Sequence, residues 1–171
     1  LLTIQSIKPP NANDTCNFAP NVCVEEGVYQ TIISVQGNTT GYYFISDRCC
    51  RNNNIINLNN AGNTGQAYYA FAPPTTVVNN SPTFAAAPVP FICSSDTVTI
   101  LNQAYDIDGD LLVYNFVVPY NGISSNFNPN PNPPNNYTWP VPLVNYSPGY
   151  SLANPFGAGG AASINTATGL A

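Results

Sequence analysis

Histidine is absent from this sequence of 171 residues, and basic side chains are nearly absent, since Lys8, Arg48 and Arg51 are the only three. Without histidine, neither a Ser-His nor a Cys-His nucleophile can be built, and charged groups for general acid–base chemistry make up only 6% of residues. We therefore expect no enzyme activity. The formal net charge is −5, so nucleic acid and anionic membrane surfaces, which need a basic footprint, are poor partners.

Long apolar and helical stretches are also missing. No apolar run approaches the roughly 20 residues of a membrane span, so we expect no membrane insertion. The 17 prolines and 12 glycines are scattered along the chain and interrupt every helical pattern. Short β-branched and aromatic runs bounded by turn residues take their place, and such runs are typical of strands.

These runs predict an all-β protein, an antiparallel β-sandwich with Pro- and Asn-rich loops and no substantial helix. Residues 28–35 and 41–46 are separated by a turn at Asn38-Thr-Thr-Gly41, so we expect them to form a hairpin. Asn79-Asn80-Ser81-Pro82 is a cluster of breakers and the position most suited to a domain junction. We place a domain boundary there, with one β domain at residues 1–79 and a second at 80–171.

Cysteine usage points to an oxidising compartment outside the cell. The chain has five cysteines, Cys16, Cys23, Cys49, Cys50 and Cys93, with neither a zinc-ligand spacing nor a histidine to complete one. Disulfide bonds explain these cysteines better than a zinc site does. Cys16 and Cys23 are expected to pair locally, whereas Cys49 and Cys50, adjacent on a strand and facing opposite sides, are expected to bond to different partners. An odd count leaves one cysteine free or bonded to sequence upstream, and we favour the second.

The acidic run at residues 106–110 is the clearest candidate for a binding site in the sequence. Asp106, Asp108 and Asp110 lie within five positions, and Gly109 lets the backbone turn sharply between them. Carboxylates this close repel one another unless a cation or water relieves them, and Ca²⁺ takes several oxygen ligands in a flexible shell. The spacing is not that of an EF-hand, whose loop needs a Glu at its twelfth position. We predict Ca²⁺ here, helped by Asn79 or Asn80; the alternative is a solvated, metal-free Asp-Gly turn.

Several strings resemble known families. The run Ala104-x-Asp106-x-Asp108-Gly109-Asp110-x-Leu112-x-Tyr114 is similar to the calcium motif of cadherin-like and bacterial Ig-like repeats. The run Arg48-Cys-Cys-Arg-Asn52, with Cys23-Val-Glu-Glu-Gly-Val-Tyr29 before it, resembles a recurring module of large Bacteroidetes surface adhesins. Those adhesins are exported by the type IX secretion system and serve gliding motility.

The resemblance implies a secreted, extracellular, cell-surface protein whose second domain is a cadherin-like or Ig-like sandwich. It also implies that strands before Leu1 and after the Thr168-Gly169-Leu170 turn lie outside this chain, so that residues 1–171 alone would associate or fold poorly. Asp96-Thr97-Val98 resembles the Asp-Thr-apolar acceptor of Bacteroidetes O-glycosylation, which makes Thr97 the predicted glycosylation site.

Two functions from different classes follow. The first is an adhesion or stalk module of a large secreted surface adhesin, stiffened by Ca²⁺ and disulfides, and flanked by other domains of the same polypeptide. The second is a structural subunit of an extracellular filament whose neighbouring copies complete one another's sheets. The surface or glycan ligand is open: Tyr42-Tyr43-Phe44, Tyr68-Tyr69, Tyr137 and Trp139 are either a sugar-stacking surface or ordinary sandwich residues.

Overall fold

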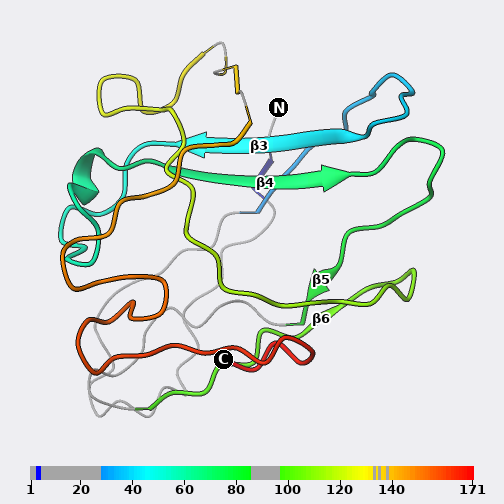
Figure 1. Ribbon diagram of the computed structural model, residues 1–171. Coiled ribbons are helices and arrows are strands. Elements are labelled where there is room, and N and C mark those ends of the chain that lie inside the picture. Colours follow the sequence, from blue (N-terminus) through cyan, green and yellow to red (C-terminus); the bar gives the residue numbers. More distant parts are fainter. Residues whose placement is uncertain (1–2, 5–27, 86–96, 133, 135, 138) are drawn as a thin grey trace.

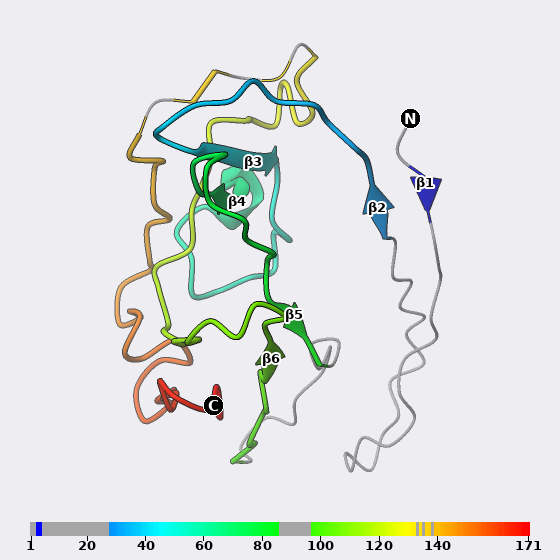
Figure 2. The same cartoon turned by 90° about the vertical axis from the view of Figure 1, so that its right-hand side faces the viewer.

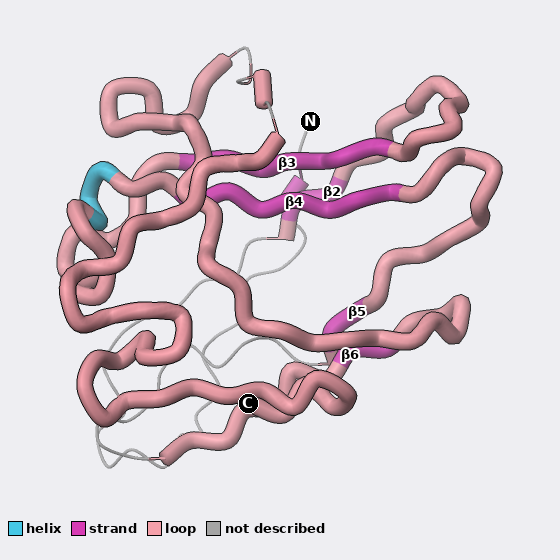
Figure 3. The backbone as a smooth tube through the Cα atoms, viewed as in Figure 1, coloured by secondary structure: helices cyan, strands magenta, loops and turns pink. Residues whose placement is uncertain are grey.

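Regular structure in this protein is almost entirely strand. The computed structural model describes residues 3–4, 28–85, 97–132, 134, 136–137 and 139–171. The strands are β1 (Thr3–Ile4), β2 (Tyr29–Gln30), β3 (Tyr42–Arg48), β4 (Gln66–Ala72), β5 (Thr83–Phe84) and β6 (Ala104–Tyr105). One turn of 3-10 helix, η1 (Ala61–Asn63), is the only helical element among the described residues, and loops connect the rest (Figure 3).

The strands pair into three antiparallel sheets of two strands each, β1–β2, β3–β4 and β5–β6. The pair β3–β4 runs along one side of the molecule in Figure 1, with β5–β6 below it. In the perpendicular view, β1–β2 lies beside the other two sheets (Figure 2). Antiparallel pairing and the scarcity of helix are thus confirmed for the described part of the chain, while a sandwich of facing sheets stays a prediction.

The longest sheet explains why the predicted hairpin is wrong. Residues 41–46 pair with β4 and not with 28–35, in a register that runs from Tyr42↔Ala72 to Arg48↔Gln66. This register places Tyr43 opposite Phe71, with ring centroids 4.8 Å apart. Cross-strand aromatic pairs of this kind stabilise a sheet. Within 28–35, only Tyr29–Gln30 forms a strand, and it pairs with β1.

Extended loops pack beside β4 through isolated bridges. Tyr120 bridges Ala67 of β4 on one side and Leu143 on the other. A small apolar cluster forms where these loops approach η1, with Leu58, Ala61 and Val144 buried at its centre. Burial of apolar side chains is the main force that holds such loops in place. Many other large apolar side chains remain exposed, Ile32 and Phe127 at 95% among them.

The adjacent cysteines lie at the end of β3. The structure joins Cys49 to Cys50 in one disulfide across a cis peptide bond, so the prediction of separate partners is wrong here. That prediction assumed a strand, in which neighbours face opposite sides. The strand ends at Arg48, so the alternation does not reach the pair. Cys16, Cys23 and Cys93 lie outside the described residues.

Candidate metal turn and aromatic cleft

The acidic turn directly follows β6. Asp106 is buried, and its Oδ1 accepts hydrogen bonds from the backbone N–H groups of Asp108 at 2.8 Å and Asp110 at 3.4 Å. Gly109 takes a φ of +80°, a left-handed conformation that glycine adopts without strain. Together these features fold the segment back on itself, so that one carboxylate oxygen from each aspartate lies within 4.8 Å of the others.

Repulsion among these carboxylates makes the turn a candidate cation site. Asp108 and Asp110 are exposed, and all three groups offer oxygen. Oxygen-only donor sets suit Ca²⁺ or Mg²⁺, and Ca²⁺ tolerates irregular shells better than Mg²⁺ does. A divalent cation would offset the mutual repulsion of three negative charges. One oxygen from each aspartate supplies three ligands of a Ca²⁺ shell of 6–8, so their second oxygens, water or further protein oxygens would complete it.

Asn80 reaches the same turn from the segment between β4 and β5. Its backbone N–H and its side-chain amide donate to the two oxygens of Asp108, the amide at 2.9 Å. Both hydrogen bonds favour the ionised carboxylate and lower the pKa of Asp108. Asn79 does not contact the aspartates through any described hydrogen bond; its amide donates to the carbonyl of Asn80 at 3.0 Å. Asn80 therefore holds Asp108 in place through donors, not through an oxygen aimed at a metal.

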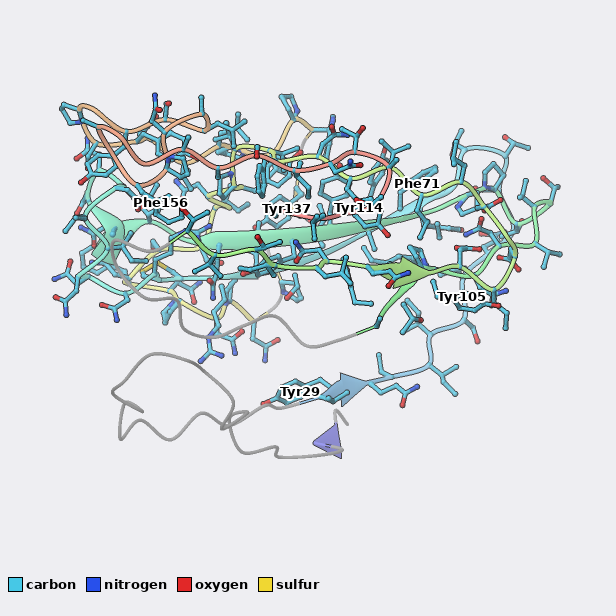
Figure 4. All side chains as sticks on the ribbon, turned by 90° about the horizontal axis from the view of Figure 1, so that it is seen from below. Tyr29, Phe71, Tyr105, Tyr114, Tyr137 and Phe156 are labelled. Atoms are coloured by element: carbon cyan, nitrogen blue, oxygen red, sulfur yellow. A yellow bond between two sulfur atoms is a disulfide. The ribbon has the colours of Figure 1, made fainter. Side chains whose placement is uncertain are left out.

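A second feature is a cleft of about 510 Å³ beside β3. From β3, the cleft is lined by Tyr43, Ile45, Ser46 and Asp47, and its other lining residues belong to the Pro- and Asn-rich segment that ends at Tyr137. Pro- and Asn-rich loops are expected from the sequence, and the described residues between 121 and 142 contain no strand longer than an isolated bridge. Figure 4 shows Tyr137 next to the β3–β4 sheet, whereas Tyr29 stands apart on β2.

Asp47 lines this cleft and binds the loop at residues 123–124. Its Oδ2 accepts hydrogen bonds from the Ser124 hydroxyl at 2.6 Å, the Ser124 N–H at 2.9 Å and the Ile123 N–H at 3.3 Å. Burial raises the pKa of Asp47, but the hydrogen bonds from Ser124, Tyr137 and Ile123 together outweigh it and leave the pKa lowered. Burial, followed by the neighbouring Asp47, raises the pKa of Tyr137 to about 12. Asp47 is thus an ionised structural acceptor at neutral pH.

Aromatic rings gather around Tyr43, which lines the cleft. Tyr43 stacks on Trp139 with centroids 5.1 Å apart and planes at 25°, and Tyr69 meets Trp139 edge-on at 5.0 Å. Tyr120 adds an edge contact to Tyr69 at 5.4 Å. The sequence pointed to three of these four rings but did not bring them together. It missed Tyr120, whose place is set by bridges to the distant residues Ala67 and Leu143, which no local pattern indicates.

The remaining predicted residues have plainer surroundings. Thr97 is exposed in a stretch without strand or helix, and Asp96 before it lies outside the described residues. Arg51 donates to the carbonyls of Gly65 at 3.0 Å and Tyr120 at 3.2 Å, although its charge would also suit a carboxylate such as Asp47. Asp47 already holds donors from residues 123 and 124.

In comparisons with known proteins, no family model, no curated protein and no solved structure matches this chain. Among the described residues, no helix is long and apolar enough to cross a membrane.

Proposed function

We propose that this chain is a non-enzymatic adhesion or stalk module of a large secreted cell-surface protein, stiffened by Ca²⁺ and by disulfides. In this proposal the β-sheets belong to sandwich-like domains that continue into neighbouring domains of the polypeptide. The resemblance of Arg48-Cys-Cys-Arg-Asn52 and of the Asp106 turn to surface adhesins of gliding bacteria supports an extracellular role. No relative adds to that support.

The single observation that carries the proposal is the convergence of Asp106, Asp108 and Asp110 within 4.8 Å, with Asn80 bonded to Asp108. Asn80 lies at the predicted boundary between the two halves of the chain, 28 residues from the turn. A cation on the aspartates would therefore fix the connection between β4 and β5 as well as the turn itself. Stiffening a connection by a bound ion is a mechanical role suited to a stalk.

Thermal unfolding with and without Ca²⁺ tests this role. A ligand that binds only the folded state stabilises it by about 2.7 kcal/mol when its free concentration is roughly 100 times its Kd. For a chain of this size, that corresponds to a rise in Tm of roughly 5–10 °C. Asp108→Asn should abolish the rise, because it removes one ligand charge.

Asn165→Ala is the matched control for this experiment. Asn165 Oδ1 accepts the N–H groups of Ala167 and Thr168 at 3.0 Å each, so its turn has the side-chain-to-backbone pattern of Asp106 without the carboxylate cluster. This variant should lower Tm yet keep the Ca²⁺ response. An unchanged Tm of the parent protein after chelation contradicts the metal assignment.

The second candidate, a filament subunit assembled by strand complementation, is favoured by the edge of β3. Among the described residues, no backbone hydrogen bond reaches the edge of β3 that faces away from β4. An unpaired edge of seven residues accepts another strand readily. Intact mass of the native protein separates the two candidates: an adhesin module is part of one long polypeptide, whereas filament subunits are separate chains. If subunits are found, Phe44→Lys should weaken their assembly, because a charged edge opposes strand addition.

A further inference from the structure

The cleft beside β3 has the features of a carbohydrate site. We propose that it binds a neutral glycan, with the ring of Tyr43 in the cleft and the Trp139 ring stacked on it as an aromatic platform, and with the amides of Asn130 and Asn136 as hydrogen-bonding groups. This inference rests on the proposed adhesion role and names the class of ligand that the module would hold.

The first step is the exposure of the platform. Tyr43 and Trp139 are 56% and 52% exposed although their rings stack on each other. Edge contact with Tyr69 holds Trp139 from a second direction, so the platform is oriented by its neighbours and stays open to solvent. Leaving large apolar rings in water forgoes stabilisation that burial would give. The faces of sugar rings carry C–H groups with partial positive charge, which the negative face of an aromatic ring attracts.

The second step is the chemistry of the walls. Tyr43 belongs both to the platform and to the cleft, whose volume of about 510 Å³ lies within the range of roughly 300–1,000 Å³ of small-ligand sites. Asn130 and Asn136 each offer an amide that donates and accepts, as sugar hydroxyls do. No basic side chain is among the described residues that line the cleft. Together with a net charge of −5, this disfavours anionic ligands and selects neutral ones.

A proline-rich peptide is the other ligand that aromatic-lined grooves bind. Here Pro131 and Pro134 of this chain already line the cleft. They occupy part of the space in which the prolines of such a peptide would bind. The amides of Asn130 and Asn136 are also better matched to a ligand with many hydroxyl groups than to proline rings. The geometry therefore favours a glycan over a peptide.

Trp139 is the only tryptophan in the chain, so its fluorescence reports on the platform directly. The test titrates the full chain with neutral hexose oligomers (cellohexaose, maltohexaose, laminarihexaose and mannohexaose) and, separately, with decaproline. We expect a saturable fluorescence change with at least one oligosaccharide, a loss of affinity of roughly ten-fold in Tyr43→Ala, and nearly full binding in Tyr43→Phe, which keeps the ring. Asn136→Ala, outside the sheet, should weaken binding without loss of folding.

Tyr105→Ala, at an exposed tyrosine on β6, is the matched control and should bind as the parent does. No saturable response to any of the four oligosaccharides overturns the proposal, as does unchanged affinity in both Tyr43→Ala and Asn136→Ala, or saturation by decaproline alone. The same measurements test the adhesion role independently of the glycan site. If the parent protein binds an oligosaccharide but Ca²⁺ does not raise its Tm, the Ca²⁺-stiffened module is contradicted. If Ca²⁺ raises the Tm but no sugar binds, only the glycan site is contradicted.

Discussion

Ser124 donates two hydrogen bonds to one carboxylate oxygen of Asp47, from its hydroxyl at 2.6 Å and from its backbone N–H at 2.9 Å. The two residues are 77 positions apart, and this contact attaches the loop after Tyr120 to the C-terminal end of β3. Hydrogen bonds to a charged acceptor are among the stronger polar contacts in proteins. One ionised side chain that lines the cleft therefore holds the loop at residues 123–124 against β3.

We expect the contribution of this contact to depend on pH. The folded protein lowers the pKa of Asp47 below 3.8, so its stabilisation is present above that value and is lost as the pH falls through the lowered pKa. Ser124→Ala should cost about 1–2 kcal/mol at pH 7, and this cost should shrink in acid as the pH falls through the lowered pKa of Asp47. Ser125→Ala removes a hydroxyl that accepts from Asn128 and touches no described carboxylate, so its cost should not change with pH. Equal pH dependence of Tm in both variants would contradict the role of Asp47.

Gly122, next to this contact, is expected to be intolerant of any side chain. Its φ is +82°, and a Cβ there would collide with Oδ1 of Asp47 and crowd Ala67. Gly149 has a similar φ of +87° but nothing within 4 Å of the corresponding position. Gly149→Ala should therefore cost only the backbone strain, about 1–2 kcal/mol, whereas Gly122→Ala should cost clearly more. Chemical denaturation of the two variants compares them, and equal losses would show that the close approach to Asp47 has no energetic weight.

Peptide mapping without reduction checks the cysteine pair. Because Cys49 is bonded to Cys50, a peptide that contains both should be two hydrogens lighter than its reduced form and should carry no second peptide. A cross-link from this peptide to one that contains Cys16, Cys23 or Cys93 would contradict the pairing. Free thiols at all five positions in freshly isolated protein would also remove the case for an oxidising compartment.

Local patterns in the sequence anticipated part of the local structure. The predicted strand run at 41–46 matches β3 within two residues at each end, because β-branched and aromatic residues suit an extended backbone, whereas the run at 28–35 forms a strand only at Tyr29–Gln30. The aspartate turn is equally local, since its ligands lie within five positions and Gly109 supplies the positive φ. Proline and glycine exclude long helices wherever they stand, and this too needs no knowledge of distant contacts.

Partners distant in the sequence were not anticipated, and the reason is physical. The choice of β4 over 28–35 as the partner of β3 depends on side-chain packing such as Tyr43 against Phe71, which no local pattern encodes. The contact between Asp47 and Ser124 likewise spans 77 residues and joins two residue types that occur throughout the chain. The grouping of aromatic rings around Tyr43 could not be predicted for the same reason. Trp139 contacts Tyr43 and Tyr69 although it is about 70 residues or more away from them in the sequence.

The variant Asn80→Asp tests the metal site at the aspartate turn most directly. Asn80 now donates to both oxygens of Asp108, so a carboxylate there replaces an attractive amide with a like charge. Without metal, Tm should fall, and the fall should shrink at high salt, which screens exposed charges. With Ca²⁺ present, the fourth carboxylate should raise the affinity, because ligand charge strengthens calcium sites. Asn154→Asp adds the same charge in an exposed turn away from the aspartates and should leave both quantities nearly unchanged. Calorimetric titration measures the affinity. A lower affinity for Ca²⁺ in Asn80→Asp than in the parent would mean that the Asp108 side of the turn does not face the ion.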